Sequence, residues 1–397
     1  MHPIRFYKIH SFLVQFGGAL CVALYIPYLL HLGLTPADIF LINAVYWLVI
    51  SSTEVITGAF ADCLSRGLSV RVGLILSALG TAIYASALLA SDKWLIMAIA
   101  LAAETLEGLG CAFINGAQQA WISDALIHEG RKDEQGSVMG RAAKWGSFGL
   151  LVGGAASFLL IHAGYATGWA TRTAFLLLAL AFCAKWMNGE GESKARTSLK
   201  AVLKSSLSAL RSDRSLKWAA AAAIVMGFVL PFNLTWVPHF THRLGATLTT
   251  ALWITINIGL ILGGYLVQKA SAVKARTDHG MIVAIGLSGI GLASLGATSG
   301  CIWPFALVLI HEIGRGMFQP SMDNFICSRV GKDFKATYNS LNSMISRSGY
   351  ALVLGANWLF ISWMGAKSSD EAIWLIAGSC LTACGIAFWI YRPRQTT

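Results

Sequence analysis

Residues 104–115 read Glu-Thr-Leu-Glu-Gly-Leu-Gly-Cys-Ala-Phe-Ile-Asn, and residues 312–323 read Glu-Ile-Gly-Arg-Gly-Met-Phe-Gln-Pro-Ser-Met-Asp. Both stretches lie within long apolar segments, and both place polar or small residues at offsets of 0, 3, 7 and 11. At roughly 100° per residue, these offsets fall within about 80° of one another, so each stretch predicts one polar stripe on a helix. Charge inside a bilayer is costly and normally faces a bundle interior or a water-filled path. The recurrence of the stripe therefore predicts two related bundles around a polar pathway.

The composition is that of a polytopic membrane protein. Of the 397 residues, 56% are hydrophobic and 12% are charged, and the mean hydropathy is +0.62. A soluble protein carries far more charge on its surface. The net charge of +11 also suits nucleic-acid binding, but basic loops on one membrane face explain it better. We therefore expect membrane lipid, and no nucleic acid, as a partner.

Motifs of metal sites and of enzymes do not occur in the sequence. The eight cysteines lack the spacing of a zinc site or a disulfide framework, so we expect neither a metal nor a cofactor. Neither His-Glu-x-x-His nor a Gly-x-Ser-x-Gly elbow occurs, and there is no nucleotide-binding loop. This pattern disfavours an intramembrane enzyme and direct drive by ATP.

Twelve apolar stretches reach about 20 residues, the length that crosses a bilayer as a helix. They lie at 9–31, 37–61, 70–90, 94–124, 137–162, 170–188, 216–239, 247–269, 280–299, 302–328, 336–364 and 371–391. The fourth and tenth exceed this length, so they could be bent. We expect an all-α membrane protein with twelve transmembrane helices in two six-helix bundles, 1–188 and 216–397, joined by a cytoplasmic linker at 189–215.

The basic residues predict the orientation. With the N-terminus inside, one set of loops holds most of the Lys and Arg residues, and the other holds only Lys93, Arg172, Arg243 and Lys367. Loops rich in Lys and Arg stay in the cytoplasm. We therefore expect both termini to be cytoplasmic, in a monomeric multi-pass protein of a bacterial inner membrane.

The turn after the second stretch reads Gly58-Ala-Phe-Ala-Asp62-Cys-Leu-Ser-Arg66. Together with the twelve spans, it resembles the major facilitator superfamily, whose signature between helices 2 and 3 has Gly, Asp and Arg at this spacing. The resemblance implies that Gly58 lets helices approach and that Asp62 pairs with Arg66 or lies near a helix N-terminus. An ordinary charged turn explains the same residues. We assign to a cytoplasmic gate Glu54, Gly58, Asp62, Arg66, Asp124 and Arg141.

Two further segments partly resemble drug–proton antiporters of the superfamily. Glu107-Gly108-Leu109-Gly110 matches the end of an element in the fourth helix, in which Glu104 replaces the family's Arg. Residues 149–154, Gly-Leu-Leu-Val-Gly-Gly, resemble the antiporter signature with Leu150 in place of Pro. Tight helix packing also explains these glycines. Export is therefore only slightly favoured over import.

The resemblance implies that spans 1, 4, 7 and 10 line a central cavity and that spans 3, 6, 9 and 12 face lipid. The charges agree, because spans 3, 9 and 12 have none in their interiors and span 6 has only Lys185 near one end. From this arrangement we predict the substrate-binding residues to be Arg315, Arg347, Asn115, Gln118, Gln319, Asp323, Gln15, Asn233 and Trp236.

Proton coupling is predicted at Glu104, Glu107 and Glu312. Glu104 and Glu107 lie one turn apart, and two carboxylates in a poorly hydrated cavity should not both be ionised. The alternative is a static pair neutralised by Arg315, Arg347 or Lys144.

Glu312 and Arg315 have the i, i+3 spacing of an ion pair. Two interpretations fit this spacing. In the first, the two side chains only neutralise each other. In the second, Arg315 binds an anionic substrate group and Glu312 releases that group.

The sequence thus predicts a proton-coupled secondary active transporter that moves a small organic solute by alternating access, with protons as the coupling ion. The cavity arginines favour the alternative, an importer of an anionic metabolite or siderophore. The acidic pair and the partial signature favour export.

Overall fold

The computed structural model describes residues 2–187, 213–272, 277–298, 300–329, 335–365 and 369–393, without the side chains of 62–63, 132, 271–272, 277, 327–329 and 335–340. All regular structure in these ranges is helical. The chain divides into two compact units, residues 1–199 and 200–397. The predicted linker at 189–215 lies outside the described residues except for 213–215, where a helix begins.

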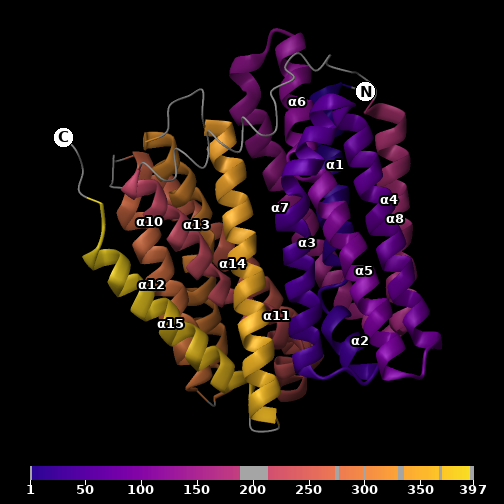
Figure 1. Ribbon diagram of the computed structural model, residues 1–397, viewed down its shortest axis with the longest axis vertical. Coiled ribbons are helices and arrows are strands. Elements are labelled where there is room, and N and C mark those ends of the chain that lie inside the picture. Colours follow the sequence, from indigo (N-terminus) through magenta and orange to yellow (C-terminus); the bar gives the residue numbers. More distant parts are fainter. Residues whose placement is uncertain are drawn as a thin grey trace. The chain divides into compact units, whose positions relative to one another are not determined.

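The N-terminal unit, drawn from indigo to magenta in Figure 1, is a bundle of long helices with short connections. Its elements are α1 (Pro3–Ala19), α2 (Tyr25–His31), α3 (Pro36–Cys63), α4 (Arg66–Ser86), α5 (Lys93–Ile114), α6 (Ala117–His128), α7 (Gln135–Leu160) and α8 (Tyr165–Trp186). Short 3₁₀ helices occupy Ala87–Leu89, Lys132–Glu134 and Ile161–Ala163.

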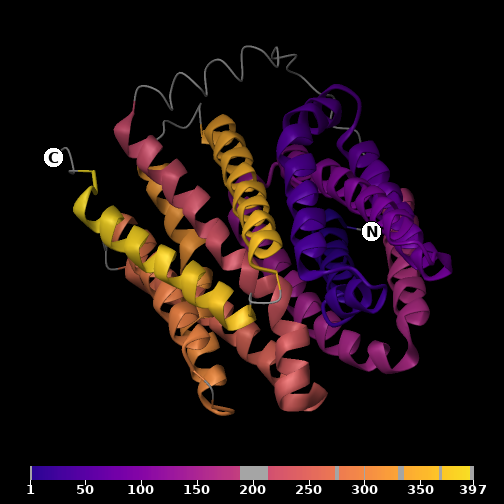
Figure 2. The ribbon, with the colours of Figure 1, turned by 60° about the horizontal axis from the view of Figure 1, so that its bottom comes forward.

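The C-terminal unit, drawn from pink to yellow, is a second helical bundle (Figure 2). Its elements are α10 (Arg214–Val225), a 3₁₀ helix at Met226–Val229, α11 (Leu230–Ala272), α12 (Thr277–Gly296), α13 (Trp303–Arg329), α14 (Lys335–Met364) and α15 (Asp370–Ile390). The long helix α11 contains a kink at Gly245, where φ is 80°, so it accounts for two of the predicted spans.

Several helices begin at a residue whose side chain caps the first turn. Thr35 accepts from the Asp38 N–H, and the Asp38 carboxylate accepts from the Thr35 N–H, with Pro36 at the first helical position. Asp92 caps α5 and Ser369 caps α15 in the same way, through their own side chains. Such caps satisfy amide groups that a helix start leaves without partners. The polar connections therefore fix where the apolar segments begin.

Among the described residues, eight helices are long and apolar enough to cross a membrane. One of them, residues 214–270, covers two predicted spans. The helices α13 and α14 are not in this set, and both carry charged residues in their interiors. The helix lengths and their composition identify an integral multi-pass membrane protein.

Three predicted spans are interrupted in the structure. The first divides into α1 and α2 around a turn at 20–24. The fourth divides at Asn115, which is extended, and at Gly116, whose φ of 76° favours glycine. The seventh contains the 3₁₀ helix just before Pro231, whose ring disrupts the preceding turn. The fourth span is therefore bent as allowed, whereas α13 continues as one helix through Pro320.

Within each unit, glycines allow helices to pack closely. The helix α7 packs along α1, and a Cβ at Gly149 would stand 2.6 Å from the Phe12 carbonyl oxygen. In the other unit α12 packs along α15, and a Cβ at Gly289 would stand 2.6 Å from the Thr382 nitrogen. Among the described residues of the N-terminal unit, nothing lies within 4 Å of a Cβ at Gly58. The close approach of helices that the resemblance implies at Gly58 stays a prediction.

Candidate functional site

Glu107 forms a buried ion pair with Arg172 of α8. The Arg172 Nη1 lies 2.6 Å from one carboxylate oxygen, and Nη2 lies 3.1 Å from the other. Thr81 of α4 donates to the same carboxylate at 2.8 Å and accepts from Arg172 at 2.8 Å. Both charged side chains are only 11% exposed. A bidentate pair of this kind gives the carboxylate two charge-assisted hydrogen bonds and, through Thr81, ties three helices together.

This pair corrects three expectations about the N-terminal unit. We expected Arg172 in an outer loop, at the very start of the sixth span, but α8 begins at Tyr165, so Arg172 lies about two turns inside the helix. Span 6 therefore contains a buried cation besides Lys185. Within the N-terminal unit, the cation that pairs with Glu107 is Arg172, and not Lys144.

Glu104 has a different environment, although it lies one turn away. Its carboxylate accepts from the Tyr84 hydroxyl at 2.9 Å. The Tyr84 hydroxyl lies 3.5 Å from that of Tyr25, which accepts from Asn43 at 3.0 Å. Glu104 is 7% exposed and forms no ion pair within the part of the chain that the structure describes. Its charge is therefore met by neutral hydroxyl groups, and not by a cation.

Sequence reasoning missed Arg172, Thr81 and Tyr84. Thr81 and Tyr84 have the i, i+3 spacing that Glu104 and Glu107 also have, on a helix that packs along α5. That shared spacing was the signal that could have found them. Arg172 could have been found by counting it within the predicted sixth span, 170–188, and not with the loop before that span. In the structure, the turn before α8 is at Gly164, whose φ is 94°.

In the C-terminal unit, Glu312 and Arg315 form the predicted ion pair at 2.6 Å. Arg315 also donates to Asn233 of α11 at 3.0 Å. The Glu312 side chain is 0% exposed, and its second oxygen has no hydrogen-bond partner among the described residues. A Cβ at Gly259 of α11 would stand 2.6 Å from the Glu312 Cβ. The two helices therefore shield this carboxylate closely.

The other predicted residues of this unit fall into separate groups. Gln319 donates to Asp323 at 2.9 Å on an exposed face of α13. Trp236 is 4% exposed and stacks on Trp253 with ring centroids 6.1 Å apart, which makes it a packing residue. Arg347 lies on α14, one turn before Tyr350, which interacts electrostatically with both Arg315 and Arg347. The structure thus brings the two predicted cations near one tyrosine.

A cavity of about 540 Å³ opens between α1, α6 and α7 in the N-terminal unit. Its lining includes Ser11 and Gln15 of α1, Gln118 and Gln119 of α6, and Ser147 of α7. The lining contains amides and hydroxyls but no charged side chain, and Gln118 Oε1 has no partner among the described residues. A cavity of this size suits a small organic molecule. Gln15 and Gln118 were both predicted as substrate residues.

Asn115 lies elsewhere. It caps α5 and donates to the Cys111 sulfur at 3.2 Å, and it is not part of the cavity lining.

The gate residues include one clear ion pair. Arg66 pairs with Asp124 of α6 and donates to the Ala120 carbonyl at 2.8 Å. The side chain of Asp62, its implied partner, lies outside the described residues. Arg141 is exposed and bonds weakly to Ser137 at 3.4 Å.

Glu54 lies in α3, where the Thr57 hydroxyl contacts the carbonyls of Glu54 and Ala112 and so joins α3 to α5. No group of three or more His, Cys, Asp or Glu residues within the described ranges is placed to hold a metal.

Comparison with solved structures finds several transporters whose fold is similar to that of this protein over nearly the whole chain. The nucleoside transporter NupG is 14% identical, with a TM-score of 0.80, over 99% of this chain and 100% of that one. A POT family transporter in complex with a thioalcohol-conjugated peptide is 11% identical, with a TM-score of 0.75, over 99% and 96%. The peptide transporter POT in complex with sulfate is 13% identical, with a TM-score of 0.73, over 99% and 94%.

No curated protein matches the sequence. A family model does match it over residues 10–354, most of its length. The chain, with its two helical units and its buried charges, belongs to the Major Facilitator Superfamily and is a membrane transporter, not an enzyme.

Proposed function

We propose that the protein is a proton-coupled secondary transporter that moves a small polar solute by alternating access. We place it in a bacterial inner membrane, with both termini in the cytoplasm. The observation that carries this proposal is the contrast between two carboxylates one turn apart. Glu107 is matched by a bidentate arginine, and Glu104 is met only by hydroxyl groups. A buried carboxylate without a cation is the one whose charge is least stabilised, so it takes up a proton most readily.

The hydrogen-bond network around Glu104 suits both protonation states. When the carboxylate is ionised, the Tyr84 hydroxyl donates to it. When the carboxyl is protonated, it donates instead, and a tyrosine hydroxyl can accept because it carries lone pairs as well as a proton. Asn43 and Tyr25 extend the same network, so the tyrosine hydroxyls can reorient without losing every partner. Protonation therefore changes the charge of the N-terminal unit without dismantling its packing.

The uncharged cavity between α1, α6 and α7 is the proposed substrate site. Amide and hydroxyl groups recognise neutral polar groups through hydrogen bonds in both directions. The solved relatives are described as nucleoside and peptide transporters, whose substrates also carry many such groups. Export is the proposed direction, on the antiporter-like residues 107–110 and 149–154.

The second candidate is import of an anionic metabolite or siderophore, and the Glu312–Arg315 pair favours it. Glu312 uses one oxygen to bind Arg315, and its second oxygen has no partner among the described residues. Protonation of Glu312 would release Arg315, whose side chain is 21% exposed, to bind a substrate carboxylate.

The test is transport in proteoliposomes under a pH gradient, with nucleosides, dipeptides and amphipathic drugs compared with organic anions. We expect Glu104→Gln to reduce gradient-driven flux by about tenfold or more, because an amide cannot exchange the coupling proton. Exchange of solute without a gradient should persist.

The matched control is Asp133→Asn, which removes an exposed acidic group outside the spans. Gradient-driven flux that is unchanged in Glu104→Gln would remove this residue from the coupling mechanism. Flux confined to anions would favour the second candidate.

A further inference from the structure

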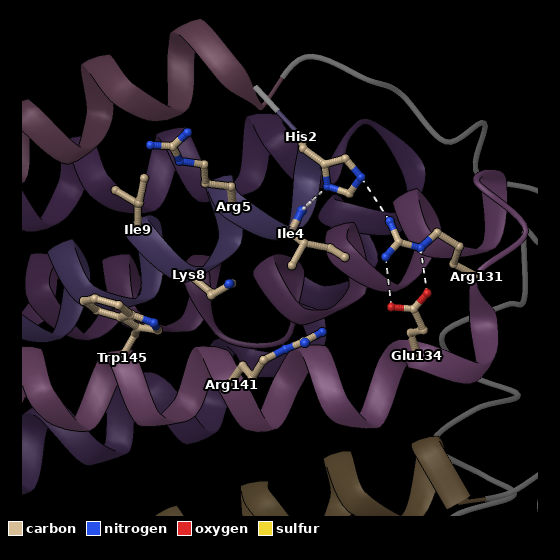
Figure 3. A pocket seen from close by; sticks show the side chains of 9 residues that line it. All are labelled: His2, Ile4, Arg5, Lys8, Ile9, Arg131, Glu134, Arg141 and Trp145. Atoms are coloured by element: carbon tan, nitrogen blue, oxygen red, sulfur yellow. Dashed lines mark hydrogen bonds and ion pairs between the residues drawn. The ribbon is translucent and has the colours of Figure 1, made fainter.

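A second cavity of the N-terminal unit, of about 670 Å³, lies where the start of α1 meets the connection to α7 (Figure 3). The residues that line it are His2, Ile4, Arg5, Lys8, Ile9, Arg131, Glu134, Arg141 and Trp145. We call it the basic pocket, because its lining contains four permanent cations and a histidine but a single carboxylate. Apart from Arg141, none of these residues belongs to the proposed transport or gate groups.

Glu134, the single carboxylate of this lining, already forms an ion pair. Arg131 binds Glu134 through both oxygens, at 2.8 and 2.9 Å, and also contacts the His2 ring at 3.0 Å. The Arg131 guanidinium holds the pKa of the Glu134 carboxyl below its ordinary value, so Glu134 stays charged and stays paired. Glu129 lies 3.3 Å from Arg131 and 3.6 Å from the His2 ring, so Arg131 is paired with two carboxylates, Glu134 and Glu129.

Three cations of the basic pocket have no acidic partner in the described ranges. No carboxylate there forms an ion pair with Arg5, Lys8 or Arg141. Lys8 on α1 and Arg141 on α7 extend into the same space from two helices, whereas Arg5 points away from them (Figure 3). Like charges that the fold holds together repel one another, and an anion between them removes that repulsion. The convergence of Lys8 and Arg141 thus forms an anion site beside the paired Arg131.

The basic pocket has an apolar end as well. Trp145 lies one turn beyond Arg141 on α7, and Ile9 follows Lys8 on α1. Trp145 is 49% exposed, and tryptophan is enriched at the depth where headgroups meet acyl chains. Lys8 and Arg131 lie outside the predicted spans, Arg141 lies about one turn inside the fifth span, and Ile9 and Trp145 lie deeper along the same two helices. This gradient along the two helices matches a molecule with a charged head and an apolar tail.

We propose that the basic pocket binds a phosphate group carried on an apolar chain, the chemistry that an anionic phospholipid presents. Lys8 and Arg141 bind the phosphate oxygens, and Ile9 and Trp145 contact the chain. Basic pockets of this kind on the cytoplasmic side of membrane proteins attract anionic headgroups. The site requires neither the transported solute nor the coupling proton, so it can be tested without a transport assay.

The experiment is a binding titration of the full chain, purified in uncharged detergent, with short-chain phosphatidylglycerol. We expect the double variant Lys8→Gln, Arg141→Gln to raise the apparent Kd by about tenfold or more, since two charge-assisted contacts are lost. The charge-conserving variant Lys8→Arg, Arg141→Lys should bind nearly as well as the original chain. The matched control is Lys185→Gln, which removes one exposed cation outside the pocket and should leave the Kd unchanged.

Two further ligands separate the possible sources of the phosphate. Short-chain phosphatidylcholine has the same chains without net charge, and glycerol phosphate has the head without the chains. We expect both to bind at least several-fold more weakly than phosphatidylglycerol. Equal affinity for glycerol phosphate would overturn the role of the chain, and an unchanged Kd in the double Gln variant would overturn the site itself.

Discussion

The helices α5 and α13 carry the same sequence pattern, but each balances a buried carboxylate with a cation in a different way. On α5, Glu107 receives its cation from α8, and the pair also engages Thr81 of α4. On α13, Glu312 receives its cation from its own helix, three residues on, and Asn233 of α11 is the additional contact. The first arrangement joins three helices through one carboxylate, and the second is a local pair with one link to a neighbour.

The difference teaches that a repeated stripe does not imply a repeated role. A bidentate pair between helices loses much of its stabilisation when either partner changes, so it suits a fixed support. A pair between residues of one turn can open without moving a helix, so it suits exchange of a proton or a ligand. Glu104, which has hydroxyl partners only, provides the N-terminal unit with a third kind of carboxylate.

The largest effect that would test this comparison is expected from Arg172→Gln. The substitution leaves Glu107 buried without its cation, and breaking a buried pair typically costs about 3–5 kcal/mol. Thermal unfolding in detergent measures the loss of stability. The fraction of ligand-free protein that stays monodisperse is a second readout. Lys185→Gln is the control on the same helix, since its ammonium is exposed.

A loss no larger than that of the control would contradict the supporting role of the Glu107–Arg172 pair. The double variant Arg172→Met, Glu107→Leu should recover much of the lost stability, because it removes the buried charge together with its partner.

A smaller effect on stability is expected from Arg315→Gln, about 2–3 kcal/mol, because Arg315 is partly exposed and Glu312 can be protonated when its partner is removed. The same substitution should weaken binding of anionic solutes more than that of neutral ones. Competition binding with matched neutral and anionic compounds measures this ratio. Equal losses for both classes would indicate that the pair is purely structural.

Much of the fold could be predicted from the sequence. Apolar length and capping residues such as Thr35 and Asp92 are local signals, and they place most helices within a few residues. The interruption at Asn115 and Gly116 was foreseen only as a bend in an over-long span. The division of the first span into α1 and α2 was missed, although Gly17-Gly18 lies just before the turn at 20–24 and a Gly-Gly pair is a turn signal.

The candidate site was predicted less completely than the fold. The Glu312–Arg315 pair was found because both partners lie within one turn. The Arg172 partner of Glu107 was missed because it lies 65 residues away and depends on how three helices pack. Gln15 and Gln118 were predicted one by one, but the sequence did not show that they share a cavity. Contacts between helices are therefore where reasoning from one sequence stops.

The smallest effect that sharpens the comparison is expected from Thr81→Val. Thr81 donates to Glu107 and accepts from Arg172, so it is the hydroxyl that links α4 to the pair. Valine keeps nearly the same shape but removes both hydrogen bonds, and we expect a loss of about 1–2 kcal/mol in unfolding free energy. The matched control is Thr105→Val on α5, because the Thr105 hydroxyl bonds only to the Leu101 carbonyl of its own helix. If Thr81→Val lowers the unfolding free energy no more than Thr105→Val does, the link to α4 contributes no stability. The Glu107–Arg172 pair would then stabilise only the contact between α5 and α8, and it would differ less from the local pair on α13.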